Sequence, residues 1–234
     1  MAGSRLAVLI PALNEVGTIA DVIAGARAHA RVIVIDNGST DGTAAAARGA
    51  GAEVLRLQQP GYDSALNAGF ARAAELELDY ALTMDADGQH DASDIPRFRA
   101  ALEHDSPVVY GVRGGPKRLA EHLFALVTRL GWGIHDPLCG MKAYQMHLYR
   151  QRGHFDSCRS IGSELLLFAA RSGMPVVGIP ISISERTDRP RFGNAIRANL
   201  TLLGAMLRAL SASRPTRSPD KRSASGGSDS KTTN

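Results

Sequence analysis

The sequence has little of what would indicate a secreted, membrane-spanning or metal-cluster protein. Its 234 residues include two cysteines, Cys139 and Cys158, which form neither a disulfide framework nor a C-x-x-C motif. No apolar run reaches the roughly 20 residues that a membrane-spanning helix requires, and residues 1–5 lead into a short apolar strand rather than a signal peptide. We therefore expect reduced thiols and a cytoplasmic protein, either free or bound peripherally to the inner face of a membrane.

A strong excess of one charge is also missing from most of the chain. The net charge is +4, and residues 211–234, with five Lys or Arg and two Asp, contribute +3 of it. The near-neutral remainder gives no electrostatic footprint for nucleic acid, so we expect no nucleic-acid partner. Residues 211–234 are mostly Ser, Thr, Gly, Pro and charged residues, which predicts a disordered polar and basic tail after a single domain over residues 1–210.

What the sequence does have is a regular alternation of short apolar runs with amphipathic segments. The apolar runs predict buried strands, and the segments between them, about a dozen residues each, predict helices. This alternation indicates an α/β fold with a mostly parallel central sheet flanked by helices. Strands are predicted over 5–10, 31–35, 52–57, 79–84, 107–112 and 176–179. Helices are predicted over 16–29, 43–50, 61–78, 93–103, 118–132, 160–171 and 195–211.

Polar clusters follow three of the predicted strands. Asn14 and Glu15 follow the first strand, Asp36 follows the second, and Asp85 and Asp87 follow the fourth. In open parallel sheets, ligands bind outside the carboxyl ends of the strands. We therefore expect these side chains to line one binding site.

The turn after the fourth predicted strand is a candidate cation site. Asp85 and Asp87 are two residues apart, and Gln89 adds a neutral oxygen. Side chains at i and i+2 of a strand point the same way, so the two carboxylates are expected to converge on one hard divalent ion. A surface turn in which an Asp caps the next helix has the same pattern, and this alternative stays open.

Three motifs in a fixed order carry a family resemblance: Pro11-Ala12-Leu13-Asn14-Glu15, Asp36-Asn37-Gly38-Ser39-Thr40-Asp41-Gly42-Thr43 and Asp85-Ala86-Asp87-Gly88-Gln89-His90. Over residues 5–195 the chain resembles the inverting family 2 glycosyltransferases, most of all their dolichyl- or polyprenyl-phosphate mannosyltransferase branch. The resemblance implies a single GT-A, Rossmann-like domain that moves a sugar from a nucleotide-diphospho-sugar, GDP-mannose or a UDP-sugar. It also implies Mg²⁺ or Mn²⁺ at the diphosphate, and a polyprenyl phosphate at a membrane surface as the acceptor.

The resemblance also assigns residues to the donor and its metal. Asp87 and Gln89 are implied as direct metal ligands, with Asp85 bound directly or through water. Asp36 is implied to read the nucleobase, and a carboxylate, which accepts N–H donors, suits uracil or guanine. Nucleotide-sugar binding is implied for Pro11, Leu13, Asn14, Glu15, Asp36, Asn37, Gly38, Asp85, Ala86, Arg186 and Arg191.

Some of these positions depart from the family pattern or have a structural alternative. Asn37 stands where the family often has a second acid, and Asp63 stands where relatives often carry a basic or small residue. A helix N-cap is the better interpretation of Asp63. Glu15 could instead stabilise a helix N-terminus by its charge. The usual Ser/Lys element of the basic loop is replaced by Arg189–Gly193.

Catalytic roles are implied for Asp87, Arg113, Asp136 and Glu164. Arg113 is suited to grip a phosphate in its planar fork, and Lys142 could hold a phosphate too. A lipid phosphate is already ionised and needs charge neutralisation and alignment rather than a base. A hydroxyl acceptor needs a general base, for which Asp136 and Glu164 are the candidates. Each of three residues also has a structural alternative. Arg113 could be a solvated arginine, Asp136 could cap a turn, and Glu164 could be an acid at a helix N-terminus.

Three other functions were weighed. One is a glycosyltransferase acting on a hydroxyl acceptor in polysaccharide or glycolipid synthesis. Another is a sugar-nucleotide pyrophosphorylase, which should have a Gly-rich, basic loop after the first strand, unlike Pro11–Glu15. The third is a non-catalytic protein bound to a membrane through the amphipathic segments 118–132 and 195–211. Replacement of Asp87 separates these enzymes from such a scaffold.

Overall fold

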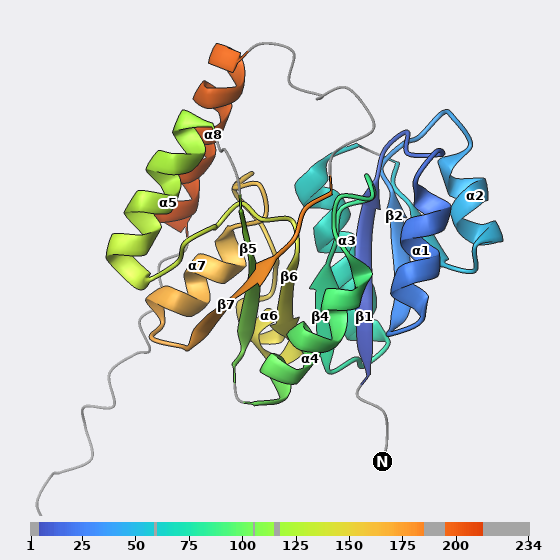
Figure 1. Cartoon of the computed structure of the whole chain (residues 1–234), viewed down its shortest axis with the longest axis horizontal. Coiled ribbons are helices and arrows are strands. Elements are labelled where there is room, and N and C mark those ends of the chain that lie inside the picture. The colour runs from blue at the N-terminus through green and yellow to red at the C-terminus, as the bar shows by residue number, and fades with distance from the viewer. Residues whose placement is uncertain (1–4, 59, 105, 115–117, 185–194, 213–234) are drawn as a thin grey trace, which may run out of the picture.

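A seven-stranded sheet runs through the part of the chain that the computed structural model describes, which is residues 5–58, 60–104, 106–114, 118–184 and 195–212. The strand order is β3-β2-β1-β4-β6-β5-β7 (Figure 1). The strands are β1 (Leu6–Ala12), β2 (Arg31–Asp36), β3 (Glu53–Arg56), β4 (Tyr80–Thr83), β5 (Val108–Arg113), β6 (Lys142–Gln145) and β7 (Val176–Ile181).

The sheet is mostly parallel, as the sequence predicts. Parallel pairs join β1 to β2 and β4, β2 to β3, and β5 to β7. The exception is β6, which runs antiparallel between β4 and β5. The sequence analysis missed β6 and the helix α6 (Met146–Arg152) that follows it. The four residues of β6 include a lysine and a glutamine and form no apolar run, so their burial comes from neighbouring strands rather than from a local pattern.

Helices cover both faces of the sheet. The side chains of β1 alternate between the faces, with Leu9 in one core cluster and Val8 and Ile10 in the other. The Val8 face packs against α1 (Ile19–Arg27), α2 (Thr43–Gly49) and α4 (Ile95–Glu103), the last of which is preceded by the short 3₁₀ helix η1 (Ala92–Asp94). The Leu9 face packs against α3 (Tyr62–Glu75), α5 (Leu119–Trp132), α6, α7 (Glu164–Arg171) and α8 (Ala195–Ala212).

The pair α5 and α8 lies at the flank of the molecule opposite α1 and α2 (Figure 1). The Asn199 side chain on α8 accepts a hydrogen bond from the Ala120 amide at the start of α5, at 3.1 Å. This contact fixes the first turn of α5 against α8.

The last helix extends to Ala212, close to the predicted domain boundary at residue 210. Residues 213–234 lie outside the described residues, so the disordered tail stays a prediction. Among the helices of the described residues, none combines the length and the apolar character needed to cross a bilayer.

Candidate active site

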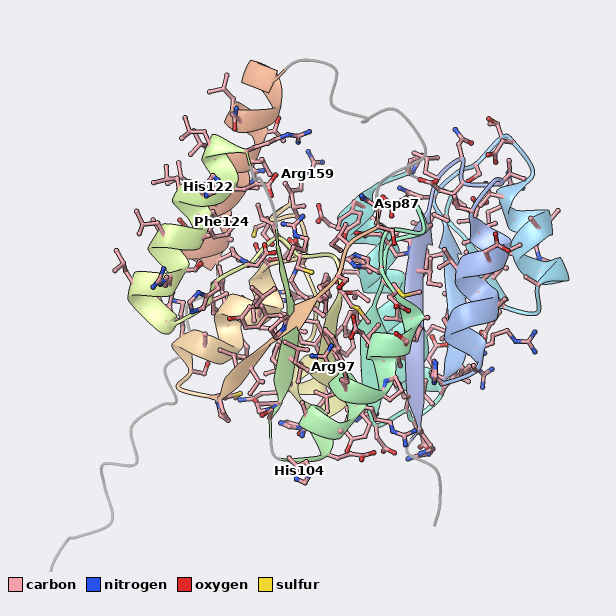
Figure 2. The ribbon with its side chains drawn as sticks, in the orientation of Figure 1. Asp87, Arg97, His104, His122, Phe124 and Arg159 are labelled. Carbon is pink, nitrogen blue, oxygen red and sulfur yellow. The ribbon has the colours of Figure 1, made fainter. Side chains whose placement is uncertain are left out.

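The carboxyl ends of β1, β2 and β4 meet at one edge of the sheet. Ala12 at the end of β1 pairs with Asp36 at the end of β2, and Leu9 pairs with Thr83 at the end of β4. Figure 2 places Asp87 at this edge, whereas His104, after α4, lies at the opposite edge. The polar clusters that follow the three strands are therefore brought together as the sequence predicts.

The loops after β1 and β2 are joined by hydrogen bonds. The Asn14 amide donates to Ser39 Oγ at 2.9 Å, and the Thr40 amide donates back to Asn14 Oδ1 at 2.9 Å. The Glu15 amide donates to Thr43 Oγ1 at 2.8 Å. Asn14 has φ 54°, a left-handed conformation that Asn tolerates better than most residues. These contacts shape one wall of the predicted nucleotide site.

Asp36 has a buried carboxylate oxygen that makes no hydrogen bond to the described residues. The residue is 0% exposed, and its Oδ1 accepts the Ser39 amide at 3.0 Å. Its Oδ2 has no hydrogen-bond partner among the described residues, and Arg56 Nε lies 3.5 Å away. A buried acceptor without a hydrogen bond is costly, so Oδ2 is suited to accept an N–H group from a nucleobase.

Asn37 and Gly38 continue this wall. The Asn37 side chain accepts the amide hydrogen of Gly61, at the start of α3, at 2.6 Å. Gly38 has φ 92°, which strains any residue with a side chain. Two further predicted donor residues, Pro11 and Leu13, are partly exposed at and just after the end of β1.

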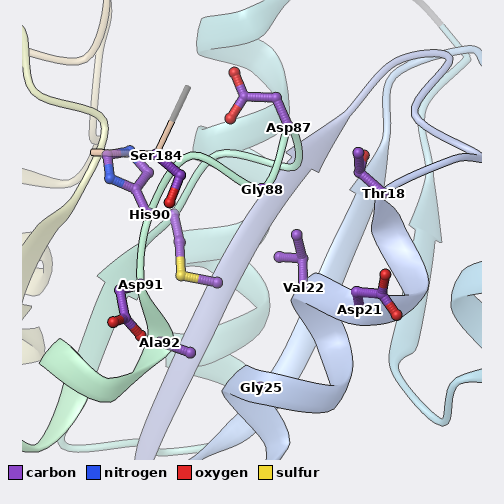
Figure 3. A pocket seen from close by; sticks show the side chains of 11 residues that line it. Thr18, Asp21, Val22, Gly25, Asp87, Gly88, His90, Asp91, Ala92 and Ser184 are labelled. Atoms are coloured by element: carbon purple, nitrogen blue, oxygen red, sulfur yellow. The ribbon is translucent and has the colours of Figure 1, made fainter. Parts of the chain in front are cut away.

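The turn after β4 is held by Thr18, which immediately precedes α1, and by Ser184, which follows β7. Thr18 Oγ1 donates to the Ala86 carbonyl at 2.7 Å, and the Gln89 amide donates to Asp87 Oδ1 at 3.2 Å. Gln89 Nε2 donates to the Ser184 carbonyl at 3.3 Å, which leaves Oε1 as the acceptor of that side chain. A cavity of about 450 Å³ separates α1 from this turn, with Asp87 in its wall (Figure 3).

Asp85 lies in a site built from several elements. His90 Nε2 lies 3.1 Å from Asp85 Oδ2. Burial acts to raise the pKa of Asp85, but the contact with His90 and the positive charges of Lys142 and Arg113 outweigh it and hold that pKa below its usual value. A Cβ added at Gly140 would overlap the Asp85 carboxylate and lie 2.6 Å from its Cγ. Asp85 is therefore kept ionised, with a glycine making room for it.

These residues fit a divalent cation. Asp85, Asp87 and Gln89 supply oxygen donors, the type that Mg²⁺ and Mn²⁺ prefer. Strand alternation does not place the two carboxylates, however, because β4 already ends at Thr83. Asp85 and Gln89 line a second cavity, whereas Asp87 lines the cavity beside α1. Their roles as metal ligands stay a prediction.

That second cavity, of about 250 Å³, lies on the predicted acceptor side and is lined by Arg113 with Asp85 and Glu121. Arg113 donates from Nε and Nη2 to the Asp136 carboxylate at 2.8 and 2.9 Å, and from Nη2 to Glu121 at 3.2 Å. Asp136 is 2% exposed. Burial opposes the charge of Arg113, but Asp136 raises the arginine's pKa above its ordinary value. Much of the Arg113 guanidinium that was predicted to bind a phosphate is thus hydrogen-bonded to Asp136, and the two side chains form an ion pair.

Glu164, the other candidate base, is engaged elsewhere. Its buried carboxylate accepts hydrogen bonds from Arg152 at 2.9 Å, from the Ser157 amide at 2.6 Å and from the Ser157 hydroxyl, and it lies 2.8 Å from His154 Nε2. Burial would raise its pKa, but these contacts lower it to about 2. It starts α7 and does not line the acceptor-side cavity. This geometry favours the helix N-terminal interpretation, and a role as base stays an unsupported prediction.

The basic residues are divided between two regions. Arg186 and Arg191 lie outside the described residues, so their predicted contacts with the diphosphate stay predictions. Lys142 lies on β6, buried, with Nζ donating to the Gly162 carbonyl at 3.0 Å. Burial lowers its pKa, although nearby acids oppose the shift. Lys142 therefore contributes a buried positive charge near Asp85 and is not a surface ligand for phosphate.

Sequence reasoning missed the parts that His90 and Gly140 play. His90 lies in the quoted motif, but its 3% exposed side chain and its contact with Asp85 depend on the turn. Gly140 follows the Asp136-Pro137 dipeptide, which marked the loop, but close approach to Asp85 leaves no local signal beyond the glycine itself.

Comparisons with known proteins point in one direction. A family model described as glycosyl transferase family 2 matches residues 7–153. An uncharacterized glycosyltransferase of Mycobacterium tuberculosis is 31% identical over 214 residues, which cover 86% of this chain and 95% of that protein. The polyprenol monophosphomannose synthase of Mycolicibacterium smegmatis is 29% identical, covering 78% of each chain.

A solved structure extends the comparison to the fold. It is glucosyl-3-phosphoglycerate synthase from Mycobacterium tuberculosis in complex with Mn²⁺, UDP and glucosyl-3-phosphoglycerate. It superposes with a TM-score of 0.70 at 22% identity, covering 92% of this chain and 82% of that one. At this identity the likeness shows the fold alone.

Proposed function

Because the chain belongs to glycosyl transferase family 2 and is a glycosyltransferase with the expected GT-A fold, we propose that it transfers a sugar from a nucleotide-diphospho-sugar to a polyprenyl phosphate. The transfer inverts the anomeric carbon and uses Mg²⁺ or Mn²⁺. The observation that carries this proposal is the acidic turn after β4, where Asp85 is held ionised beside Gly140, at the same edge of the sheet as the buried carboxylate of Asp36.

The donor half of the site is formed by the loops after β1, β2 and β4. Asp36 Oδ2 accepts an N–H group of the base, which uracil N3 and guanine N1 both provide. GDP-mannose or a UDP-sugar as the donor satisfies this acceptor. The M. smegmatis relative is named for monophosphomannose, and the structural neighbour binds UDP, so each alternative has one point of support.

The reaction is a single in-line displacement. A phosphate oxygen of the acceptor forms a bond to the anomeric carbon while the bond from that carbon to the diphosphate oxygen breaks, and the electron pair leaves with the nucleoside diphosphate. A divalent ion held by Asp85, Asp87 and Gln89 would neutralise the charge that develops on the diphosphate. The residues of this chain hold the two reactants in line, which supplies much of the rate.

The acceptor-side cavity favours an acceptor that needs no base. Asp136 is paired with Arg113 through two side-chain hydrogen bonds, and Glu164 is held at a pKa of about 2 by its own partners. A phosphate monoester is ionised at neutral pH and reacts without losing a proton to the protein. Arg113, which lines this cavity and is held by Asp136 and Glu121, then contacts the phosphate.

A hydroxyl acceptor is the alternative. Asp136 would then have to leave Arg113 and accept the hydroxyl proton as general base. The structural neighbour, which binds glucosyl-3-phosphoglycerate, is named for a small phosphorylated product rather than a lipid. A pyrophosphorylase is disfavoured by the family, and a purely non-catalytic scaffold by the same match.

The test is transfer of labelled sugar from GDP-mannose or UDP-glucose, with Mn²⁺, to a short polyprenyl phosphate and to the matching polyprenol. We expect transfer to the phosphate only, and a loss of at least about a hundredfold in Asp87→Asn, because the transition state loses charge neutralisation. Asp79→Asn is the matched control, since Asp79 lies at the other end of β4, paired with Arg5. Transfer to hydroxyl acceptors alone would disprove the lipid-phosphate proposal, and full activity of Asp87→Asn or activity in EDTA would disprove the metal site.

A further inference from the structure

The pair α5 and α8 carries a surface of exposed leucines that the sheet does not cover. We define the leucine face by six side chains that are 42–80% exposed, namely Leu119, Leu123, Leu126, Leu130, Leu200 and Leu207. The two helices pack against each other on one flank of the molecule (Figure 1). An exposed apolar cluster of this kind marks an interaction surface more often than a scattered leucine does.

The helical repeat separates this face from the core. Positions 119, 123, 126 and 130 follow the i, i+4, i+7, i+11 spacing of one helical stripe. The core contacts of α5 come from a different stripe, with Ala120, Phe124 and Thr128 buried. Packing of α5 on the sheet is thus complete without the leucine face, which needs another explanation.

We propose that the leucine face lies in the headgroup region of an anionic lipid bilayer. The charges around it are complementary to such a surface. The sequence of α8 contains no acidic residue, and the single acid of α5, Glu121, is paired with Arg113. Exposed Arg129 precedes Leu130 in α5, and the segment that follows α8 in the sequence carries a net charge of +3. Apolar side chains bordered by basic residues are the pattern of helices that bind membrane interfaces.

The leucine face adjoins the acceptor side of the site. Glu121, in the first turn of α5, lines the acceptor-side cavity together with Arg113 and Gly140. Leu119, which is 79% exposed, is two residues before it. A bilayer against this face would present lipid phosphates at the level of that cavity. Membrane binding by the leucine face would serve the proposed function, on which its biological role rests. The binding itself is tested without any transfer reaction.

The test measures binding of the full chain to vesicles by co-sedimentation, without any sugar acceptor. We expect binding to vesicles of phosphatidylcholine with 30% phosphatidylglycerol to exceed binding to phosphatidylcholine alone by about tenfold, and to weaken at high salt. The Leu126→Glu/Leu130→Glu variant should lose at least about tenfold in vesicle binding. The matched control is Ala20→Glu, at an exposed position of α1 on the opposite flank. Circular dichroism melts confirm that both variants fold.

Three results would overturn the inference. The first is no binding of the wild-type chain to either vesicle, and the second is binding by the double variant equal to that of the wild type. The third is a dimer in size-exclusion light scattering that the double variant dissociates, which would identify a second copy as the occupant. Transfer to a short, water-soluble prenyl phosphate in the absence of vesicles is measured in parallel. Absence of this transfer in the wild-type chain would count against the proposed function. The vesicle result counts only for or against membrane binding by the leucine face.

Discussion

The environment of Asp85 is set both by His90 of its own motif and by residues distant in the sequence. His90 contacts one of its oxygens, while Lys142 and Arg113 contribute positive charge from β6 and β5. Gly140 contributes by having no side chain. An ionised carboxylate with open space beside it is ready to bind a cation without first losing a proton.

Gly140→Ala should therefore weaken divalent metal binding. The added Cβ would overlap the Asp85 carboxylate, so Asp85 must move away from its contact with His90. We expect a loss of about tenfold or more in Mn²⁺ affinity, measured by calorimetric titration in the presence of a nucleoside diphosphate, because ligand placement governs metal affinity.

Gly131→Ala is the control for this substitution. Gly131 lies in α5, and a Cβ there would meet nothing within 4 Å. Its Mn²⁺ affinity should equal that of the wild type, and its stability should rise by about 0.5–1 kcal/mol because alanine is the better helix former. Unchanged Mn²⁺ affinity in Gly140→Ala would contradict the assignment of Asp85 to the metal.

At the scale of elements, the loop before α7 is organised by two buried acids. Asp156 accepts the amides of Cys158, Ser160 and Gly162 at 3.0–3.1 Å. Glu164, at the first position of α7, closes the same loop through Ser157. Gly162 in turn accepts the Lys142 ammonium. The loop therefore connects α7 to β6, next to the predicted metal site.

Glu164→Gln should reduce stability in a pH-dependent way. The folded-state pKa of about 2 lies below the ordinary value of 4.5, so the stabilisation is complete above about pH 4.5 and is lost as the pH falls toward 2. Allowing for solvent screening, we expect the variant to lose about 2 kcal/mol of unfolding free energy at pH 7 and to show a flatter dependence between pH 5 and 2. Urea unfolding at several pH values measures this.

The same variant distinguishes a structural Glu164 from a catalytic one. With a structural role, kcat at a temperature well below the melting transition stays near the wild-type value. A fall in kcat of about a hundredfold or more at unchanged stability would restore Glu164 as a general base. Glu75→Gln serves as the control, because Glu75 is 64% exposed in its ion pair with Arg72 and should change stability by less than about 0.5 kcal/mol.

The elements that could be predicted from the sequence are those with a local signal. The apolar runs that form β1, β2 and β4 end in polar turns, so both the strands and the edge where the turns meet followed from pattern alone. β6 could not be predicted, because Lys142 and Gln145 are buried or partly buried only through pairing with β4 and β5.

Contacts between distant segments limited what could be said of the site. Arg113 and Asp136 were each predicted to lie on the acceptor side, but nothing in the sequence indicates that they bind each other across 23 positions. Their pairing changes the expected chemistry, since Asp136 would have to leave Arg113 before accepting a proton and an engaged Arg113 is a constrained phosphate ligand. The strand-alternation argument for Asp85 and Asp87 failed because the strand ends at Thr83.

At the scale of the whole molecule, the site divides between two parts of one sheet. The loops after β1 and β2 form the side where Asp36 lies, and the other side is formed by β5, β6 and α5 around Arg113. The turn after β4 lies between them, because β4 is the strand that separates β1 from β6. A donor bound with its metal would therefore contact the turn and the first side together, and binding should stabilise the entire fold.

This coupling predicts which nucleotides raise the melting temperature. UDP or GDP with Mn²⁺, at about 100 times the dissociation constant, should add about 2.7 kcal/mol of stability, or several degrees in Tm for a domain of this size. CDP at the same concentration should give a smaller shift, because cytosine N3 carries no hydrogen for Asp36 Oδ2 to accept and its dissociation constant is therefore larger. In Asp36→Asn an N–H donor can replace that acceptor, so the advantage of UDP or GDP over CDP should disappear while the Mn²⁺-dependent part of the shift remains. Equal shifts for all three nucleotides in the wild type would show that Asp36 does not read the base, and a shift independent of Mn²⁺ would separate the nucleotide site from the turn after β4.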